Sequence, residues 1–194
     1  MNWLGRIVQK EITKDDTVLD VGCGIMQATT ESLNSSSGKR KLKDVMAISK
    51  DSSGRGTLAC RSLLGCDVWR PYLDVSKNFF PVVNLSTSEL DRFLDSSFDV
   101  VICLDVLEHL EYEKALKTIS EMKRIARRKV IVYTPVNIDQ PEEQLENSWG
   151  MGSNQYQKHL SLISSGVLQG MGFKVSFPEP DRNSFGVFYK DESR

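Results

Sequence analysis

Two glycines and an aspartate follow a short apolar run near the start of the chain, in a spacing that suggests ligand binding. Residues 17–24 read Thr-Val-Leu-Asp-Val-Gly-Cys-Gly, so Asp20 lies two residues before Gly22, and Gly24 closes the segment. Glycine has no Cβ and therefore lets a backbone turn approach a ligand closely. A carboxylate beside such a turn suits a ligand with an ammonium group and hydroxyls better than a polyphosphate. We interpret this segment as a binding turn.

A dinucleotide is the alternative ligand for such a turn. Its fingerprint is G-x-G-x-x-G/A, followed by an acid about 20 residues further along the chain. Gly22 and Gly24 supply the first two positions, but Gln27 stands at the third. The next acid at the end of a strand-like run is Asp67, which is 67 − 24 = 43 residues beyond Gly24. A plain tight turn also stays open, because two glycines alone are a weak signal.

Asp67 follows the run Leu-Leu-Gly-Cys at 63–66. A carboxylate at the end of a second parallel strand can accept hydrogen bonds from both hydroxyls of a ribose. The alternative is a structural role as a helix N-cap, because Asp caps helices well and Pro71 follows closely.

Asp105, Glu108 and His109 stand at i, i+3 and i+4, a spacing that predicts one helical turn with all three side chains on one face. The chain has two histidines, and the other is His159. A histidine or carboxylate beside an acceptor can remove a proton from an oxygen nucleophile. We therefore take Asp105, His109 and His159 as the candidate catalytic residues.

The elements that must position these residues are strands alternating with helices. Strand-like runs cover residues 17–21, 62–67, 80–84, 98–103 and 129–134. This alternation predicts an α/β fold with a parallel sheet and right-handed crossovers. In such a sheet, ligands lie beyond the carboxyl ends of the strands, where the candidate residues stand.

Two helices and a final hairpin complete the expected elements. Residues 111–128 begin with acidic and end with basic side chains, which complements the helix dipole. The expected buried residues of this helix are Leu116, Ile119 and either Met122 or Ile125. An apolar face over residues 1–13 predicts a further helix. Residues 173–177 and 185–189 are strand-like with no helical pattern between them, so they predict a hairpin.

Four segments together resemble the class I S-adenosylmethionine-dependent methyltransferases, in particular the small "methyltransferase type 11" branch. Residues 17–24 resemble the first motif of that family, and residues 98–110 resemble the fourth. Residues 130–137 resemble the fifth strand and its Thr-Pro-Asn turn, and residues 154–175 resemble a histidine-containing loop, helix and Gly-Phe turn. The resemblance implies a Rossmann-like three-layer sandwich whose mostly parallel seven-stranded sheet has an antiparallel C-terminal hairpin strand.

The resemblance also assigns cofactor-binding residues. These are Asp20, Gly22, Cys23, Gly24, Asp67, Val68, Asn84 and Leu104. The ribose acid maps onto Asp67 if residues 31–57 are an insertion, and Val68 and Trp69 would then stand near adenine, although we expect Trp69 to belong to the core. The family has an acid after the third strand, where this chain offers Asn84, Ser86 and Thr87. It also has a third glycine where this chain has Met26.

S-adenosylmethionine is the cofactor that the resemblance implies, and methyl transfer is the reaction. We expect a small-molecule or saccharide-like acceptor, because the chain lacks a basic face and an appended recognition domain. An RNA or protein methyltransferase and a catalytically degenerate cofactor-binding subunit remain alternatives. Some similar RNA and quinone-precursor methyltransferases hold a divalent metal with a carboxylate-x-x-Glu-His set and a distant histidine. We expect no metal here, but this alternative stays open.

Composition bounds the remaining questions. At 194 residues with 40% hydrophobic residues, the chain is expected to form one domain, residues 1–194, with a flexible insertion near 31–57 that is rich in Ser, Gly and Lys. The net charge of −1 indicates no general affinity for nucleic acid or anionic membranes. Four cysteines without C-x-x-C spacing and the lack of a signal-like or membrane-length apolar stretch predict a cytoplasmic protein. The oligomeric state is not predicted.

Overall fold

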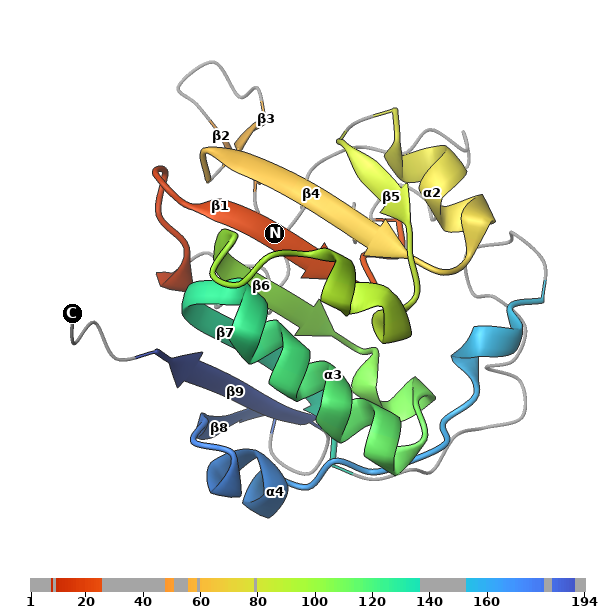
Figure 1. Cartoon of the computed structure of the whole chain (residues 1–194), viewed down its shortest axis with the longest axis vertical. Coiled ribbons are helices and arrows are strands. Elements are labelled where there is room, and N and C mark those ends of the chain that lie inside the picture. Colours follow the sequence, from red (N-terminus) through yellow and green to blue (C-terminus); the bar gives the residue numbers. More distant parts are fainter. Residues whose placement is uncertain are drawn as a thin grey trace.

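Apolar side chains alternate between the two faces of one seven-stranded sheet, which is the centre of the computed structural model (Figure 1). The structure describes residues 8, 10–25, 48–50, 56–58, 60–78, 80–136, 153–179 and 183–190. The strands are β1 (Thr17–Val21), β4 (Ser62–Asp67), β5 (Val82–Asn84), β6 (Phe98–Leu104), β7 (Ala126–Pro135), β8 (Lys174–Glu179) and β9 (Asn183–Tyr189).

The strand order is β5-β4-β1-β6-β7-β9-β8. Strands β5, β4, β1, β6 and β7 run parallel to one another, and β9 runs antiparallel to both β7 and β8. This confirms the predicted mostly parallel sheet and its antiparallel C-terminal hairpin. The chain leaves β1 toward β4 on one side and β6 lies on the other, so the order reverses at β1. A ligand site is expected beyond the carboxyl end of that strand.

Two apolar layers cover the two faces of the sheet. In β6, Val100 and Ile102 belong to one core cluster, whereas Val101 and Cys103 belong to the other. The first cluster includes Val8 and residues of α2 (Arg70–Ser76), and the second includes residues of α3 (Tyr112–Ile125) and α4 (Ser165–Gly170). Because both faces are buried, the central strands are continuous apolar runs, as in other parallel sheets. The three-layer arrangement is therefore confirmed.

Helix α3 differs from its prediction in two respects. It ends at Ile125 instead of residue 128, because β7 begins at Ala126 without a connecting loop. Its fully buried stripe includes Ala115, Ile119, Met122 and Ile125, whereas Leu116 is only half-buried. Leu116 was expected in the stripe, but the helix faces the sheet along the Ala115–Ile119 side, which turns Leu116 toward its flank.

Arg127 and Arg128 therefore stand on a strand, where they bind buried carboxylates at the amino ends of the sheet. Arg127 donates to Asp99, and Arg128 donates to Asp16. Asp99 also accepts hydrogen bonds from the backbone and hydroxyl of Thr17, and these partners hold its pKa below the ordinary value despite its burial. These bonds tie β1, β6 and β7 together at the end of the sheet opposite the ligand site.

Parts of the predicted insertion and N-terminal helix are described. Within residues 31–57, β2 (Ile48–Lys50) pairs antiparallel with β3 (Gly56–Leu58). Val8, Lys10 and Glu11 are helical, as expected for the first segment. Met26, Gln27 and the basic cluster at 39–43 lie outside the described residues. Among the helices of the described ranges, no one combines the length and apolar composition that a membrane span requires.

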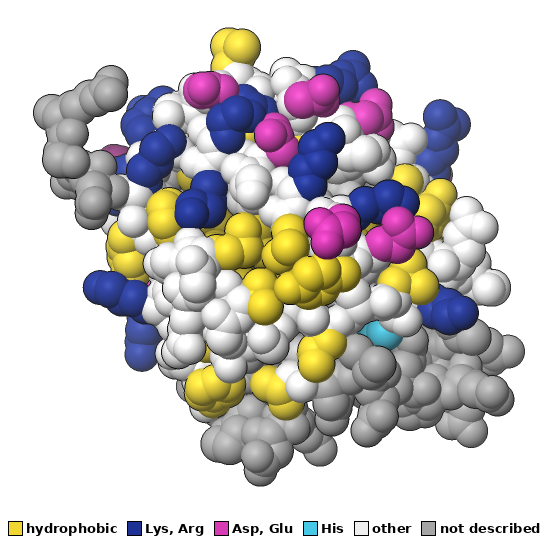
Figure 2. Space-filling view, turned by 60° about the horizontal axis from the view of Figure 1, so that its bottom comes forward, with side chains coloured by type: hydrophobic (Ala, Val, Ile, Leu, Met, Phe, Trp, Pro, Cys, Tyr) yellow, Lys and Arg dark blue, Asp and Glu magenta, His cyan; other side chains and the backbone are white. Residues whose placement is uncertain are grey.

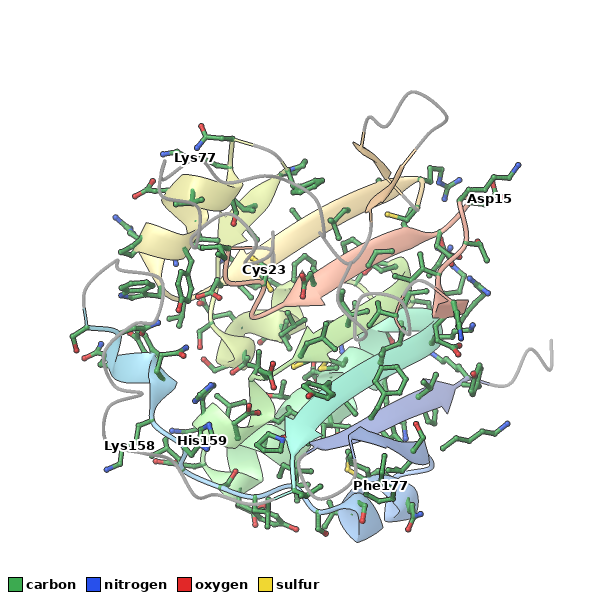
Figure 3. The ribbon with its side chains drawn as sticks, turned by 180° about the vertical axis from the view of Figure 1, so that it is seen from behind. Asp15, Cys23, Lys77, Lys158, His159 and Phe177 are labelled. Carbon is green, nitrogen blue, oxygen red and sulfur yellow. The ribbon has the colours of Figure 1, made fainter. Side chains whose placement is uncertain are left out.

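The charges on one face of the molecule are interspersed. Figure 2 shows basic and acidic side chains mixed over one part of this face and a group of hydrophobic side chains beside them. From behind, Figure 3 shows Asp15 at one end of the sheet and Cys23 at the other, the side on which Lys158 and His159 also lie. The histidine loop and the end of β1 thus share one edge of the fold.

Candidate functional site

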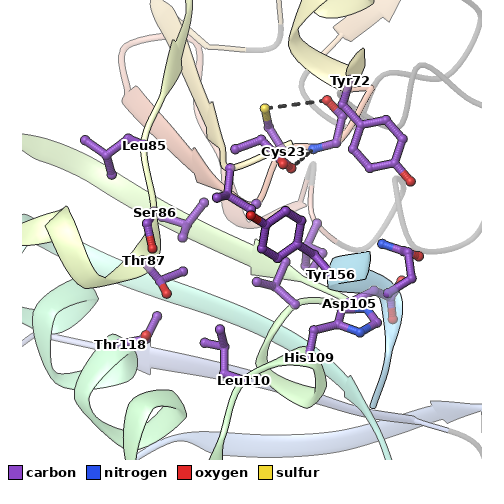
Figure 4. Close-up of a pocket in the computed structure, with 18 of the residues that line it drawn as sticks. Cys23, Tyr72, Leu85, Ser86, Thr87, Asp105, His109, Leu110, Thr118 and Tyr156 are labelled. Atoms are coloured by element: carbon purple, nitrogen blue, oxygen red, sulfur yellow. Dashed lines mark hydrogen bonds between the residues drawn. The ribbon is translucent and has the colours of Figure 1, made fainter. Parts of the chain in front are cut away.

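A cavity of about 590 Å³ lies at the carboxyl ends of β1, β4 and β6 (Figure 4). This volume is within the range of small-molecule sites. Its walls come from four parts of the chain: the end of β1 and the turn after it, the ends of β4 and β5, the segment after β6 with α3, and residues 153–160. The cavity includes Gly22, Cys23, Gly24, Asp67, Val68, Leu104, Asp105 and His109. Eight predicted site residues therefore share one cavity.

The glycine turn, residues 22–25, has a backbone that favours glycine. Gly22 and Gly24 have φ angles of +69° and +54°, in the left-handed region. The Cys23 backbone nitrogen donates to the Cys66 carbonyl at 2.9 Å, which ties the turn to β4. A Cβ on Gly22 would lie 2.3 Å from a methyl group of Val106, whereas one on Gly24 would meet only Tyr72 at 3.8 Å. The turn therefore packs directly against the segment after β6.

Asp67 connects the glycine turn to the end of β4. One carboxylate oxygen accepts from the Gly24 backbone nitrogen at 2.9 Å, and the other accepts from the Trp69 nitrogen at 2.8 Å. Burial raises the pKa of this carboxyl, and the two backbone donors partly oppose that shift. The N-cap of α2 is Trp69 and not Asp67. A carboxylate has about four acceptor positions on its two oxygens, so backbone donors do not exhaust its capacity to bind a ligand.

Two predicted cofactor residues stand beside the cavity without lining it. Asp20 lies in β1, directly below the glycine turn, and burial together with the nearby Asp67 raises its pKa to about 8. Asn84 donates through its amide to the carbonyls of Asp67 and Val68, so it holds the β4 end in place from outside. The cavity wall after β5 consists of Leu85, Ser86, Thr87 and Ser88 instead.

The sequence predicts an α-helical turn around Glu108, and the structure corrects this prediction. The residues Leu107–His109 form a 3₁₀ turn (η3), and Asp105 precedes it with φ +53°. Asp105 and His109 line the cavity, but Glu108 points into the protein, where the Thr134 hydroxyl donates to it at 3.2 Å. Burial and the nearby Asp105 raise the pKa of Glu108 well above its usual range. Because of the left-handed residue and the tighter turn, Asp105 and His109 line the cavity while Glu108 is buried beside it.

The two histidines are adjacent across 50 positions of sequence. Their ring centroids are 5.1 Å apart, and His109 Nδ1 lies 3.3 Å from the Lys158 carbonyl oxygen. Burial lowers the pKa of His109 to about 4, and it also lowers the pKa of His159. Both rings are therefore neutral near pH 7, and a proton on Nδ1 of His109 leaves Nε2 as an acceptor.

Glu108, His109 and His159 also form a group with metal-ligand chemistry. One ligand atom of each residue lies within 4.8 Å of those of the other two. A hydrogen bond from the distal ring nitrogen to a carbonyl, as His109 makes to Lys158, is the usual support of a metal-binding histidine. The arrangement fits a divalent ion by the nature and proximity of its donor atoms.

Residues 153–160 contribute cavity residues that the sequence did not single out. Asn154, Tyr156 and Gln157 line the cavity, and so does Tyr72 from α2. The Glu108 carbonyl accepts from the Leu160 nitrogen at 2.7 Å, which anchors the segment to η3. A signal was available in the sequence: an aromatic residue with amide side chains on both sides stands close to a histidine in a loop. Only the fold shows that these side chains line the cavity.

The comparisons with known proteins agree with this geometry. The model of the family described as "Methyltransferase domain" matches residues 19–134, which is well over half of the chain and spans β1 to β7. The chain belongs to this methyltransferase family. S-adenosylmethionine is the methyl donor of the family, so the expected cofactor class and reaction class are confirmed.

Three proteins that are similar to this chain differ in what their names say of their function. An uncharacterized protein of Methanocaldococcus jannaschii, MJ0638, is 35% identical over 114 residues, which are 55% of this chain and 46% of that protein. This chain thus spans about half the length of that curated relative. Magnesium protoporphyrin IX methyltransferase from Synechocystis was solved with bound S-adenosylmethionine. Its comparison with this chain gives a TM-score of 0.54 and 15% identity, and it covers 97% of this chain and 76% of that chain. The small RNA methyltransferase HEN1 has a TM-score of 0.60 and 15% identity, with 97% and 25% covered.

The two solved structures share the fold of the methyltransferase domain, but their names indicate different acceptors. The fold alone therefore does not identify the acceptor of this chain. The cofactor class fits the residues present, because the cavity joins a turn with two left-handed glycines to a strand-end carboxylate.

The contact between Gly22 and Val106 yields a first prediction. Gly22→Ala should lower the free energy of unfolding by about 2–5 kcal/mol, because it adds a left-handed alanine and a clash. Gly24→Ala, which has only the backbone strain, should cost about 1–2 kcal/mol. Urea unfolding followed by circular dichroism measures both. Equal losses would mean that Val106 moves aside without cost.

Asp20 yields a second prediction, on pH. Its pKa of about 8 exceeds the ordinary 3.8, so its contribution to stability is complete at low pH and is lost as the pH rises from about 4 through 8. Asp20→Asn, which resembles the protonated acid, should therefore raise the free energy of unfolding at pH 8.5 by about 1–3 kcal/mol. At pH 4 it should change little. Denaturant melts at both pH values measure the difference, and an equal effect at the two values would contradict the shift.

Proposed function

We propose that this chain transfers the methyl group of S-adenosylmethionine to a small-molecule or saccharide-like acceptor. One observation carries the proposal: a single cavity is lined both by the glycine turn with Asp67 and by Asp105 with His109. A binding surface for the donor and a candidate base for the acceptor thus open into the same space.

The cofactor roles follow from the chemistry of each wall. The backbone of Gly22, Cys23 and Gly24 would contact the methionine part. Asp20 lies beneath the turn, and an ammonium group bound above it would favour its ionised form against the effect of burial. Asp67 would accept hydrogen bonds from the ribose hydroxyls. Val68, which is 37% exposed in the cavity, and Leu104 would pack against adenine. Asn84 would support this site indirectly, by holding the backbone of Asp67 and Val68.

The bound cofactor supplies an activated methyl group, so the residues of the chain mainly need to align the acceptor. His109 is the candidate general base, because it lines the cavity and its Nδ1 is engaged by the Lys158 carbonyl. Asp105 lines the same cavity and could position the acceptor hydroxyl. His159 packs against the His109 ring and would orient it.

The preference for a small acceptor rests on the cavity and on the surface. The acceptor side of the cavity offers the amides of Asn154 and Gln157 and the hydroxyl of Tyr156, which suit a polar uncharged molecule. Basic and acidic side chains alternate on the face in Figure 2, whereas an RNA-binding face would carry a basic patch. RNA binding that weakens steeply with salt would favour the alternative acceptor instead.

Titration of the protein with S-adenosylhomocysteine tests the cofactor assignment. At a hundred times its dissociation constant, the ligand should raise the free energy of unfolding by about 2.7 kcal/mol, because it binds only the folded state. NAD at the same concentration should have no effect. Differential scanning fluorimetry measures both, and no shift with millimolar S-adenosylhomocysteine would end the proposal for the isolated chain.

A divalent metal centre is the second candidate, favoured by the group of Glu108, His109 and His159. These residues would supply one carboxylate oxygen and two imidazole nitrogens, a set that binds Mn²⁺ or Zn²⁺. A metal ion there would lower the pKa of an acceptor hydroxyl and replace the need for a free histidine base.

Manganese titration separates the two candidates. If the metal centre exists, Mn²⁺ should raise the melting temperature of the wild type, and His159→Ala should abolish that rise because it removes one ligand without entering the cavity wall. Glu89→Gln, which removes an exposed carboxylate in η2 (Thr87–Arg92), is the control and should respond like the wild type. Identical manganese responses of wild type and His159→Ala would exclude the centre.

A further inference from the structure

Tyr156 is one of the few large apolar side chains with substantial exposure, yet it points inward. It is 42% exposed and lines the cavity. In Figure 4 its ring reaches into the middle of the cavity, between Cys23 on one side and His109 on the other. The exposed part of the ring is thus part of the cavity surface, where a ligand would meet its aromatic face.

Hydrogen bonds hold the backbone on both sides of this ring. On one side, the Asn154 carboxamide oxygen accepts from the Tyr156 backbone nitrogen at 3.0 Å, and the buried Asn154 side chain also hydrogen-bonds the Tyr72 hydroxyl. On the other side, the Glu108 carbonyl accepts from the Leu160 nitrogen. The backbone that carries the ring is therefore held in position before any ligand arrives, which reduces the entropy lost on binding.

Charged residues of both signs line the cavity around the ring. Asp67 and Asp105 line it, and the Cys23 thiol is neutral near pH 7 because burial raises its pKa. The lysines that line the cavity, Lys114 and Lys117, belong to α3 near Thr118, and Lys114 pairs with Glu111. Tyrosine attracts cations through the negative face of its ring.

We infer that Tyr156 recognises the positive charge of the methyl donor and so distinguishes the sulfonium cofactor from its neutral thioether product. This inference rests on the proposed function, because it concerns the same cofactor. The aromatic face stabilises the charged donor, and that stabilisation disappears with the charge after methyl transfer. Tyr156 thereby favours exchange of product for fresh cofactor.

The test compares the affinities of S-adenosylmethionine and S-adenosylhomocysteine, which differ by one methyl group and one positive charge. Isothermal titration calorimetry measures both for the wild type, Tyr156→Phe and Tyr156→Leu. Tyr156→Leu should weaken S-adenosylmethionine about tenfold and leave S-adenosylhomocysteine within about twofold, because it keeps apolar bulk but removes the aromatic face. Tyr156→Phe, which keeps the ring, should retain the wild-type ratio of affinities.

Tyr112→Leu is the matched control, because Tyr112 is equally exposed at the start of α3 but does not line the cavity. It should change neither affinity, and Tyr156→Gln repeats the test if the leucine variant does not fold. Equal losses of both ligands in Tyr156→Leu would overturn the inference while leaving the proposed function intact. Failure of the wild type to bind either ligand would overturn both.

Discussion

The hydrogen bond between the Gly24 backbone and the Asp67 carboxylate is the constraint on which the site depends. It joins the turn after β1 to the end of β4 across 43 residues of sequence, and the bond from Cys23 to the Cys66 carbonyl runs beside it. Together they hold the two glycines in the left-handed conformation while Val106 packs against Gly22. The position of every other cavity wall is set relative to this pair of strand ends.

Burial of carboxyl groups is the second physical theme. Asp20, Asp67 and Glu108 all have pKa values raised by desolvation, whereas His109 and His159 have theirs lowered. The free energy that burial costs an anion is recovered when a cation comes close. The cofactor of this family carries an ammonium and a sulfonium. In the arrangement that we propose, the ammonium would lie near the carboxylates beside the glycine turn and the sulfonium would face the Tyr156 ring. The buried carboxyl of Glu108 would also be stabilised by a divalent ion, which could then take over from His109 the activation of the acceptor hydroxyl.

The site is completed by segments that are distant in sequence. The Glu108 carbonyl binds the backbone of Leu160 and Ser161, and the Lys158 carbonyl meets His109, so the loop of residues 153–160 is fastened to the turn after β6. Asn154 extends the contact to Tyr72 on α2. This loop thereby spans the cavity from the β6 side to the β4 side. Acceptor specificity in the family can vary through such a loop while the sheet and the glycine turn stay the same.

Local sequence patterns determined the strands, the parallel sheet with its C-terminal hairpin and the glycine turn, because hydrophobic periodicity and glycine chemistry act over a few residues. The tertiary structure decided what depends on side-chain direction and long-range contact. It buried Glu108 behind the cavity wall that Asp105 and His109 line, since a left-handed residue and a 3₁₀ turn replaced the expected α-helical turn. It made Asn84 a support of the β4 end and brought Tyr156 into the cavity. These outcomes follow from packing between segments far apart in the chain, which no local spacing encodes.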